Sequence, residues 1–147
     1  PDGKSIHGLS DLQVNQFIQT KSATYALTGV AHLILDYGSV IRFDRKPGEW
    51  TLTEVAKLPG CGWAGTAVAD GRLLVAASDR LVRVSPKGAV ETLLSDVGGY
   101  YANSVTVGPD EKVYIGMRQF VAVYDPKDRA GFVHLRAPTK DALRLPK

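Results

Sequence analysis

The side chains of this chain that point most clearly to a function are aromatic and basic ones, which are typical of binding to other molecules. Two glycine-rich segments, residues 60–63 and 98–101, carry large aromatics. Their glycines allow sharp turns that push the aromatic side chains outward. Trp, Tyr and Arg are also the residue types enriched in binding hot spots. We therefore predict a partner-binding surface formed by Trp63, Tyr100 and Tyr101, with Arg80 and Arg118 as charged flanking residues.

A convergent catalytic set is not visible in the sequence. His7, His32 and His134 stand far apart and at no metal-ligand spacing. The serines lack the glycine context of a nucleophile elbow. The single cysteine, Cys61, has no second thiol with which to form a disulfide or a metal site, so we expect it to be buried or idle. The sequence therefore favours a protein that is not an enzyme.

The elements that must position these residues recur three times, about 40 residues apart. The copies read VIRFD at 40–44, LVRVS at 81–85 and VAVYD at 121–125, and each follows another short apolar run. The dipeptides Asp70-Gly71 and Pro109-Asp110 are typical of turns between strands. Repeats of this length built from short strands are typical of propeller blades. We therefore predict an all-β, propeller-like fold with about three four-stranded antiparallel blades per chain.

The repeats divide the chain into blades with flanking segments. We expect a single domain over residues 1–147, because a chain of this length buries most of its apolar surface. The expected blades are 24–58, 64–95 and 102–137, with a leading strand or extension at 1–23 and a tail at 138–147. In the first blade we expect strands at 25–30, 32–36, 39–44 and 50–58, and residues 12–19 form a separate strand that could complete another blade. The apolar run 73–77 predicts a middle strand that is packed on both faces.

Three blades are fewer than a closed propeller contains. Closed propellers typically need four to eight blades, and open blade faces would expose apolar patches. Either two chains pair into a six-bladed ring as a homo-oligomer, or the chain is part of a larger propeller. A third alternative is that the repeats close as a sandwich or barrel.

Three segments of the third repeat resemble a known family. Residues 103–110 (NSVTVGPD), 112–116 (KVYIG) and 121–126 (VAVYDP) are similar to repeats of the six-bladed propellers that include the gluconolactonase and paraoxonase-like lactonases, and of the related NHL-repeat binding proteins. The resemblance covers about three quarters of the chain. In the lactonases a central calcium is held by Asn, Asp and Glu at inner strand ends, which implies Asn103 as a calcium ligand. The matching positions of the other copies hold Gly65 or Trp63, and Ala23 or Thr24.

Three functions fit these observations. The first is a non-catalytic propeller-type binding module that recognises a protein partner, as an inhibitor, immunity or adaptor protein, without a cofactor. The second, implied by the resemblance, is a calcium-dependent lactonase or esterase-like hydrolase that uses Asn103. The third is a carbohydrate-binding propeller with Trp63 and Tyr101 as stacking platforms. In a purely structural alternative, Trp63 and Tyr101 wedge between blades. The missing catalytic set favours the first.

Composition narrows the classes of partner. The formal net charge is +3, but Lys and Arg are scattered among Asp and Glu, so we expect no nucleic-acid partner. No apolar run approaches the roughly 18 residues that span a bilayer, so we expect no membrane span. The sequence begins at Pro1 and shows no signal peptide, which leaves both the cytoplasm and the periplasm open.

A calcium titration followed by thermal melting separates the hydrolase from the two binding functions. A bound ion raises the melting temperature by mass action, because it binds the folded state alone. We expect no change in melting temperature when millimolar calcium is added. A reproducible rise with calcium would favour the hydrolase and Asn103 as its ligand.

Overall fold

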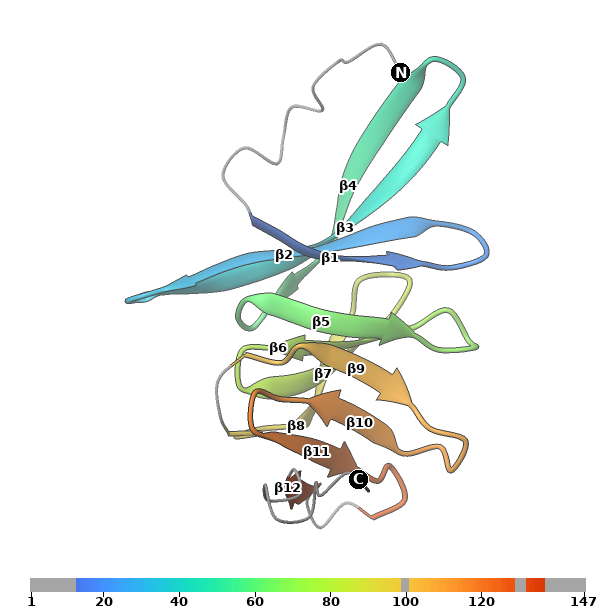
Figure 1. Ribbon diagram of the computed structural model, residues 1–147. Helices are drawn as coiled ribbons and strands as arrows, with labels where there is room; N and C mark the ends of the chain where they lie inside the picture. Colours follow the sequence, from blue (N-terminus) through green and yellow to red (C-terminus); the bar gives the residue numbers. More distant parts are fainter. Residues whose placement is uncertain (1–12, 99–100, 129–131, 137–147) are drawn as a thin grey trace, which may run out of the picture.

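Three four-stranded antiparallel sheets make up the fold. The computed structural model describes residues 13–98, 101–128 and 132–136 (Figure 1). Within these ranges there are twelve strands and no helix, and therefore no helix that could cross a membrane. The expectation of an all-β, propeller-like fold with three four-stranded blades is confirmed.

Each sheet is a meander in which strands that are consecutive in the chain are neighbours. The first sheet contains β1 (Gln13–Gln19), β2 (Thr24–His32), β3 (Leu35–Lys46) and β4 (Glu49–Leu58). The second contains β5 (Gly62–Ala67), β6 (Leu73–Ala77), β7 (Arg80–Val84) and β8 (Val90–Leu94). The third contains β9 (Ser104–Val107), β10 (Val113–Gly116), β11 (Phe120–Tyr124) and β12 (Phe132–Arg136).

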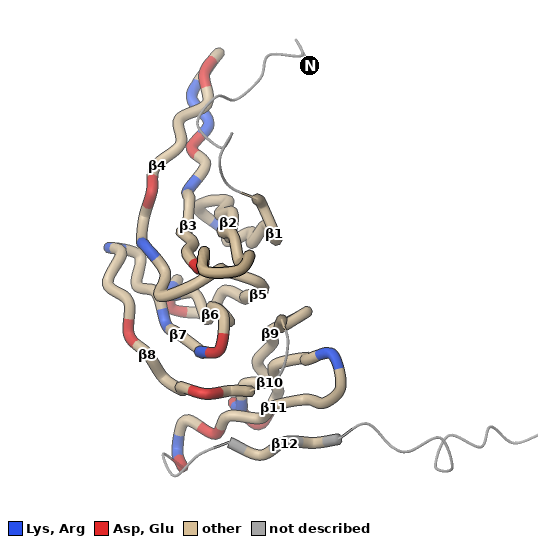
Figure 2. The backbone as a smooth tube through the Cα atoms, turned by 90° about the vertical axis from the view of Figure 1, so that its left-hand side faces the viewer, with Lys and Arg blue, Asp and Glu red and all other residues tan. Residues whose placement is uncertain are grey.

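The first strands of the three sheets lie beside one another. Strand β5 contacts both β1 and β9, and the sheets diverge from these inner strands as blades do around a shared axis (Figure 2). The inner edges of the three blades therefore come together.

The predicted turns of the second and third repeats are present. The Asp70 carboxylate accepts a hydrogen bond from the Arg72 amide at 3.0 Å, and Gly71 has a φ of +81°, which glycine adopts without strain. The Asp110 carboxylate accepts from the Lys112 amide at 3.3 Å in the same way. These local hydrogen bonds end one strand and start the next at corresponding positions of the two repeats.

The strands of the first repeat differ from those expected. Residues 13–19 form β1, which pairs with β2 and is the first strand of the first sheet rather than a strand of another blade. The expected strands at 25–30 and 32–36 are also wrong, because β2 continues to His32 and the chain turns at residues 33–34, where Leu33 has a φ of +56°. The apolar residues 33–35 look like a strand interior but form a hairpin tip. The assignment of all of residues 1–147 to one domain stays a prediction, since 1–12 and 137–147 lie outside the described residues.

The core consists of two layers of apolar side chains, one on each side of the second sheet. One layer joins the first and second sheets and the other joins the second and third. Strand β6 is buried throughout, with Leu73, Val75 and Ala77 in the first layer and Leu74 and Ala76 in the second. The two-sided burial predicted for residues 73–77 is therefore confirmed.

Gly65 sets how closely the first two sheets approach. A Cβ atom added there would lie 3.0 Å from Leu27 Cδ1, 3.1 Å from Ile18 Cδ1 and 2.7 Å from the carbonyl oxygen of Leu74. Because protein cores are close-packed, a larger side chain at this position must displace its neighbours. The absence of a side chain is thus part of the packing.

We expect Gly65→Leu to lower the free energy of unfolding by about 1–3 kcal/mol, the usual cost of overpacking a core. Urea denaturation monitored by circular dichroism measures this change. Val90→Ala, at an exposed position of β8, is the control and should change stability by less than about 0.5 kcal/mol. Equal stability of Gly65→Leu and the unchanged protein would contradict the packing of the first two sheets.

Candidate functional site

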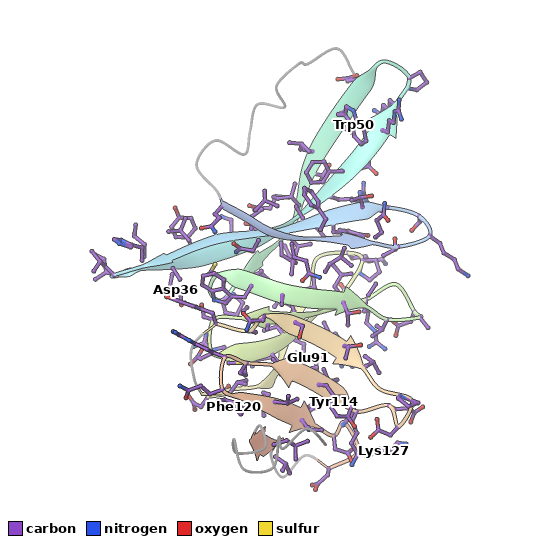
Figure 3. The ribbon with its side chains drawn as sticks, in the orientation of Figure 1. Asp36, Trp50, Glu91, Tyr114, Phe120 and Lys127 are labelled. Carbon is purple, nitrogen blue, oxygen red and sulfur yellow. The ribbon has the colours of Figure 1, made fainter. Side chains whose placement is uncertain are left out.

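The segments expected to carry the binding residues meet at one end of the sheets. Because neighbouring strands are antiparallel, the β2–β3, β6–β7 and β10–β11 turns share this end with the segments that lead into β5 and β9 (Figure 1, left). In Figure 3 the labelled side chains of Asp36 and Phe120 lie at this end. A surface assembled here would combine residues from all three sheets.

A groove of about 300 Å³ lies at this end, and we call it the hairpin groove. Its walls come from the β2–β3 hairpin, the start of β5, the β6–β7 turn and the segment before β9. The lining residues are Ala31, Leu33, Leu35, Asp36, Trp63, Ser78, Asp79 and Tyr101. The lining therefore combines five apolar or aromatic residues with three polar ones.

Two of the predicted aromatic residues contact each other in this groove. The ring centroids of Trp63 and Tyr101 are 4.3 Å apart, with an angle of 47° between the ring planes. Trp63 is half-buried and also packs against the core layer between the second and third sheets, whereas Tyr101 is 51% exposed. Trp63 thus packs between the second and third sheets and also forms part of the groove wall. Tyr101 contacts the Trp63 ring from the solvent side. Tyr100 lies outside the described residues.

The predicted basic residues occupy different positions around this end. Arg80 lies beside the groove, where its guanidinium donates to the carbonyl oxygen of Pro59 at 3.1 Å and pairs with Asp79 at 3.5 Å. Arg118 is exposed in the β10–β11 turn and does not line the groove. The structure therefore brings Trp63, Tyr101 and Arg80 together and leaves Arg118 apart.

A hydrogen-bonded cluster that the sequence did not reveal supports one wall of the groove. The amide of Cys61 donates to Asp36 Oδ1 at 2.8 Å and to Ser78 Oγ at 3.0 Å. The Ser78 hydroxyl in turn donates to the same Asp36 carboxylate. The side-chain amide of Asn15 (Nδ2) donates to Cys61 Sγ at 3.3 Å and to the Gly62 carbonyl at 2.9 Å. These bonds hold the segment that presents Trp63 against the first sheet.

The thiol of Cys61 is enclosed by this cluster. The residue is 1% exposed, and its burial raises the pKa of the thiol, with a smaller contribution from the nearby Asp36 carboxylate. The hydrogen bond from Asn15 acts in the opposite direction but does not offset the burial. A thiol with a raised pKa is a poor nucleophile, so the cluster serves structure rather than covalent chemistry.

The calcium ligand implied by the resemblance lies in the segment that leads into β9. Asn103 is exposed before β9, and its backbone amide donates to the Gly116 carbonyl at 2.7 Å. Over residues 13–98, 101–128 and 132–136, no three His, Cys, Asp or Glu side chains gather in an arrangement that could hold a metal ion. A role for Asn103 in calcium binding stays a prediction.

The most exposed apolar residues of the site are ones that the sequence analysis did not select. Leu33 is 92% exposed and Ile34 is 96% exposed at the tip of the β2–β3 hairpin. Leu35 and Tyr37 continue this exposed surface along β3. The apolar run at residues 33–35 lies between β2 and β3, which pair with each other. This position between two paired strands is the feature from which an exposed hairpin tip could have been predicted.

The architecture defines the class of protein as an all-β protein built from propeller-like blades. No protein-family profile matches the chain, and no curated protein matches it in sequence. A solved structure described as "YCF48 bound to D1 peptide" is similar, with a TM-score of 0.48 and 10% sequence identity. The match covers 93% of this chain and 57% of that chain, so this chain spans little more than half of the length of YCF48 in that structure.

Substitution of the two aromatics should separate packing from surface. We expect Trp63→Ala to lower the free energy of unfolding by about 2 kcal/mol, less than for a fully buried Trp because the ring is half-buried. Tyr101→Ala should cost about 1 kcal/mol or less, the value of an exposed aromatic contact. Thermal and urea denaturation measure both. A larger loss for Tyr101→Ala than for Trp63→Ala would contradict this division.

Proposed function

We propose that this chain is a non-catalytic binding module that recognises a protein partner through the hairpin groove and its apolar rim. The observation that carries the proposal is the tip of the β2–β3 hairpin, where Leu33 and Ile34 are almost fully exposed beside the Trp63–Tyr101 pair. Apolar surface gathered beside a groove and edged by polar residues is typical of protein–protein contact sites. A protruding apolar tip is suited to insertion into a partner.

The polar groups of the groove suggest what the partner presents. The Asp36 and Asp79 carboxylates lie among the lining residues, and Arg80 pairs with the second of them. A carboxylate accepts hydrogen bonds and attracts positive charge. The groove therefore suits a segment of a protein with an apolar side chain flanked by Lys or Arg. An inhibitor, immunity or adaptor role would follow from the identity of that partner.

The arrangement of the aromatic pair favours a protein over a sugar. A stacking platform needs a free ring face, whereas Trp63 packs against the core on one side and against Tyr101 on another. Aliphatic residues, Leu33, Ile34 and Leu35, contribute the remaining exposed apolar surface. Aliphatic side chains bury well against other apolar side chains but do not stack on sugars.

Selection of peptides from a random display library on the unchanged protein tests the proposal. We expect selected peptides to bind at the hairpin groove, so that Leu33→Asp and Tyr101→Ala each weaken binding by about 2 kcal/mol, or roughly 30-fold. Isothermal titration calorimetry measures the affinities. Recovery of one protein from lysate of the native cell, lost with Leu33→Asp, would then identify the partner.

The matched control is Trp50→Asp, which places the same charge on another exposed apolar residue, in β4 and away from the groove lining. This variant should bind the selected peptides as the unchanged protein does. Equal binding by all three variants, with their folding verified by circular dichroism, would place the contact elsewhere and overturn the proposal.

A further inference from the structure

The two end sheets each have one face that packs against none of the described sheets. In the first sheet, the residues that alternate with the core-facing ones form this free face, which we call the front face. It includes Phe17, Ala26, Ile41 and Phe43. In the third sheet the corresponding face is called the back face and includes Thr106, Tyr114, Gly116, Val121, Val123, Val133 and Leu135. Phe17 is 59% exposed, and Val133 and Leu135 are half exposed or more. These faces are therefore accessible at Phe17, Val133 and Leu135, whereas Ala26 is fully buried and Ile41 is 6% exposed.

The repeats relate these faces to contacts that exist inside the molecule. Val40 faces the second sheet from the first, and Leu81, at the same position of the next repeat, faces the third sheet. The equivalent residue of the third sheet is Val121, which lies on the back face. In the opposite direction, Val82 faces the first sheet, and its equivalent in the first sheet is Ile41, on the front face. The back face thus corresponds to the face of a sheet on which the next sheet along the chain packs. The front face corresponds to the face with which a sheet packs on the sheet before it.

Side-chain sizes at the centre of the internal contact are complementary. Gly65 of the second sheet lies against Leu27 and Ile18 of the first, and it leaves room for both. A small residue on the following sheet is matched by large residues on the preceding one. This pairing is one way to fill the space between two sheets at native density.

The same positions on the two end faces show the sizes reversed. Leu27 and Ala76 are equivalent, because they pair with the equivalent residues Val40 and Leu81. Phe17 pairs with the residue before Leu27, and Gly65 pairs with the residue before Ala76, so Phe17 is the equivalent of Gly65. The equivalents of Leu27 and Ile18 on the back face are Gly116 and Thr106. The front face therefore presents a large exposed ring where the back face has a glycine and a threonine. A projecting ring on one end thus faces small side chains on the other, where the Ser104 hydroxyl lies close to Gly116 and takes up part of the space.

We infer that two copies of this chain pair head to tail, with the front face of each copy packed on the back face of the other. The contact repeats the internal packing of successive sheets, with Phe17 over Gly116 and Ile41 close to Val121. Because each copy has one front and one back face, two such contacts close a ring of six sheets, which lies within the usual range of four to eight blades. The contacts are heterologous, since different surfaces of the two copies meet.

Two single variants and their mixture test this pairing. Multi-angle light scattering should give twice the mass of the chain for the unchanged protein. Phe17→Asp damages only the front face and Val121→Asp only the back face, but each alone places a damaged face in both contacts of the ring. We expect each variant alone to have the mass of one chain. In an equimolar mixture one contact joins two intact faces, and dimers containing one copy of each variant should reappear.

The outcomes distinguish this arrangement from others. A single-chain mass for the unchanged protein would overturn the proposal, and so would masses above two copies that grow with concentration. A dimer lost in Phe17→Asp but kept in Val121→Asp would show front faces meeting each other, which also overturns it. Failure of the folded variants to recover a dimer on mixing has the same consequence. Leu33→Asp, which alters the hairpin groove, should keep the dimer, so this inference and the proposed function fail separately.

Discussion

The fold depends on the burial of β6 on both faces. Backbone ladders join strands only within each sheet, so the relative placement of the three sheets rests on side-chain packing, with side-chain hydrogen bonds such as those between Gln16 of β1 and the backbone of Gly65 in β5. Strand β6 supplies apolar side chains to both core layers in alternation, and the second sheet is consequently the layer on which the other two are assembled. The hairpin groove takes residues from the first and second sheets and from the segment before β9, so its shape depends on the same packing.

A second constraint acts on the site itself through the amide of Cys61. This single N–H group is held by acceptors from two sheets, the Asp36 carboxylate at the start of β3 and the Ser78 hydroxyl in the β6–β7 turn. A buried amide without an acceptor is unfavourable, so both segments are kept close to the start of β5. Gly60 is required beside it, because a Cβ atom there would lie 2.5 Å from Ser78 Oγ. The position of Trp63, two residues after Cys61, follows from this arrangement.

The sequence allowed the sheets to be predicted far better than the site. The triple repeat and the turns at Asp70 and Asp110 predict strands from local pattern alone, and the structure contains them. The tip at Leu33 was missed because an apolar run resembles a strand whether it is buried or exposed, and the pairing of β2 with β3 decides which. The Asp36–Ser78–Cys61 cluster joins residues up to 42 positions apart, so no local pattern could have revealed it. The contact of Trp63 with Tyr101 likewise links two different repeats, although both residues were selected individually.

The groove and the end faces lie on different parts of each blade, and this separation has a physical consequence. The groove is formed at the ends of strands, where turns such as β2–β3 and β6–β7 meet, whereas the front and back faces are the flat surfaces of the outer sheets. In the inferred pairing of two copies, packing of sheet on sheet would bury residues such as Phe17 and Val121 and leave the turns at the rim. In a ring of two copies, each groove would stay exposed on the same rim of the ring, because head-to-tail contacts repeat the internal relation between blades. Two linked grooves can engage a partner that carries two copies of the recognised segment, and the second contact then forms at high effective concentration. The order of blades would thereby turn a weak single contact into a stronger double one.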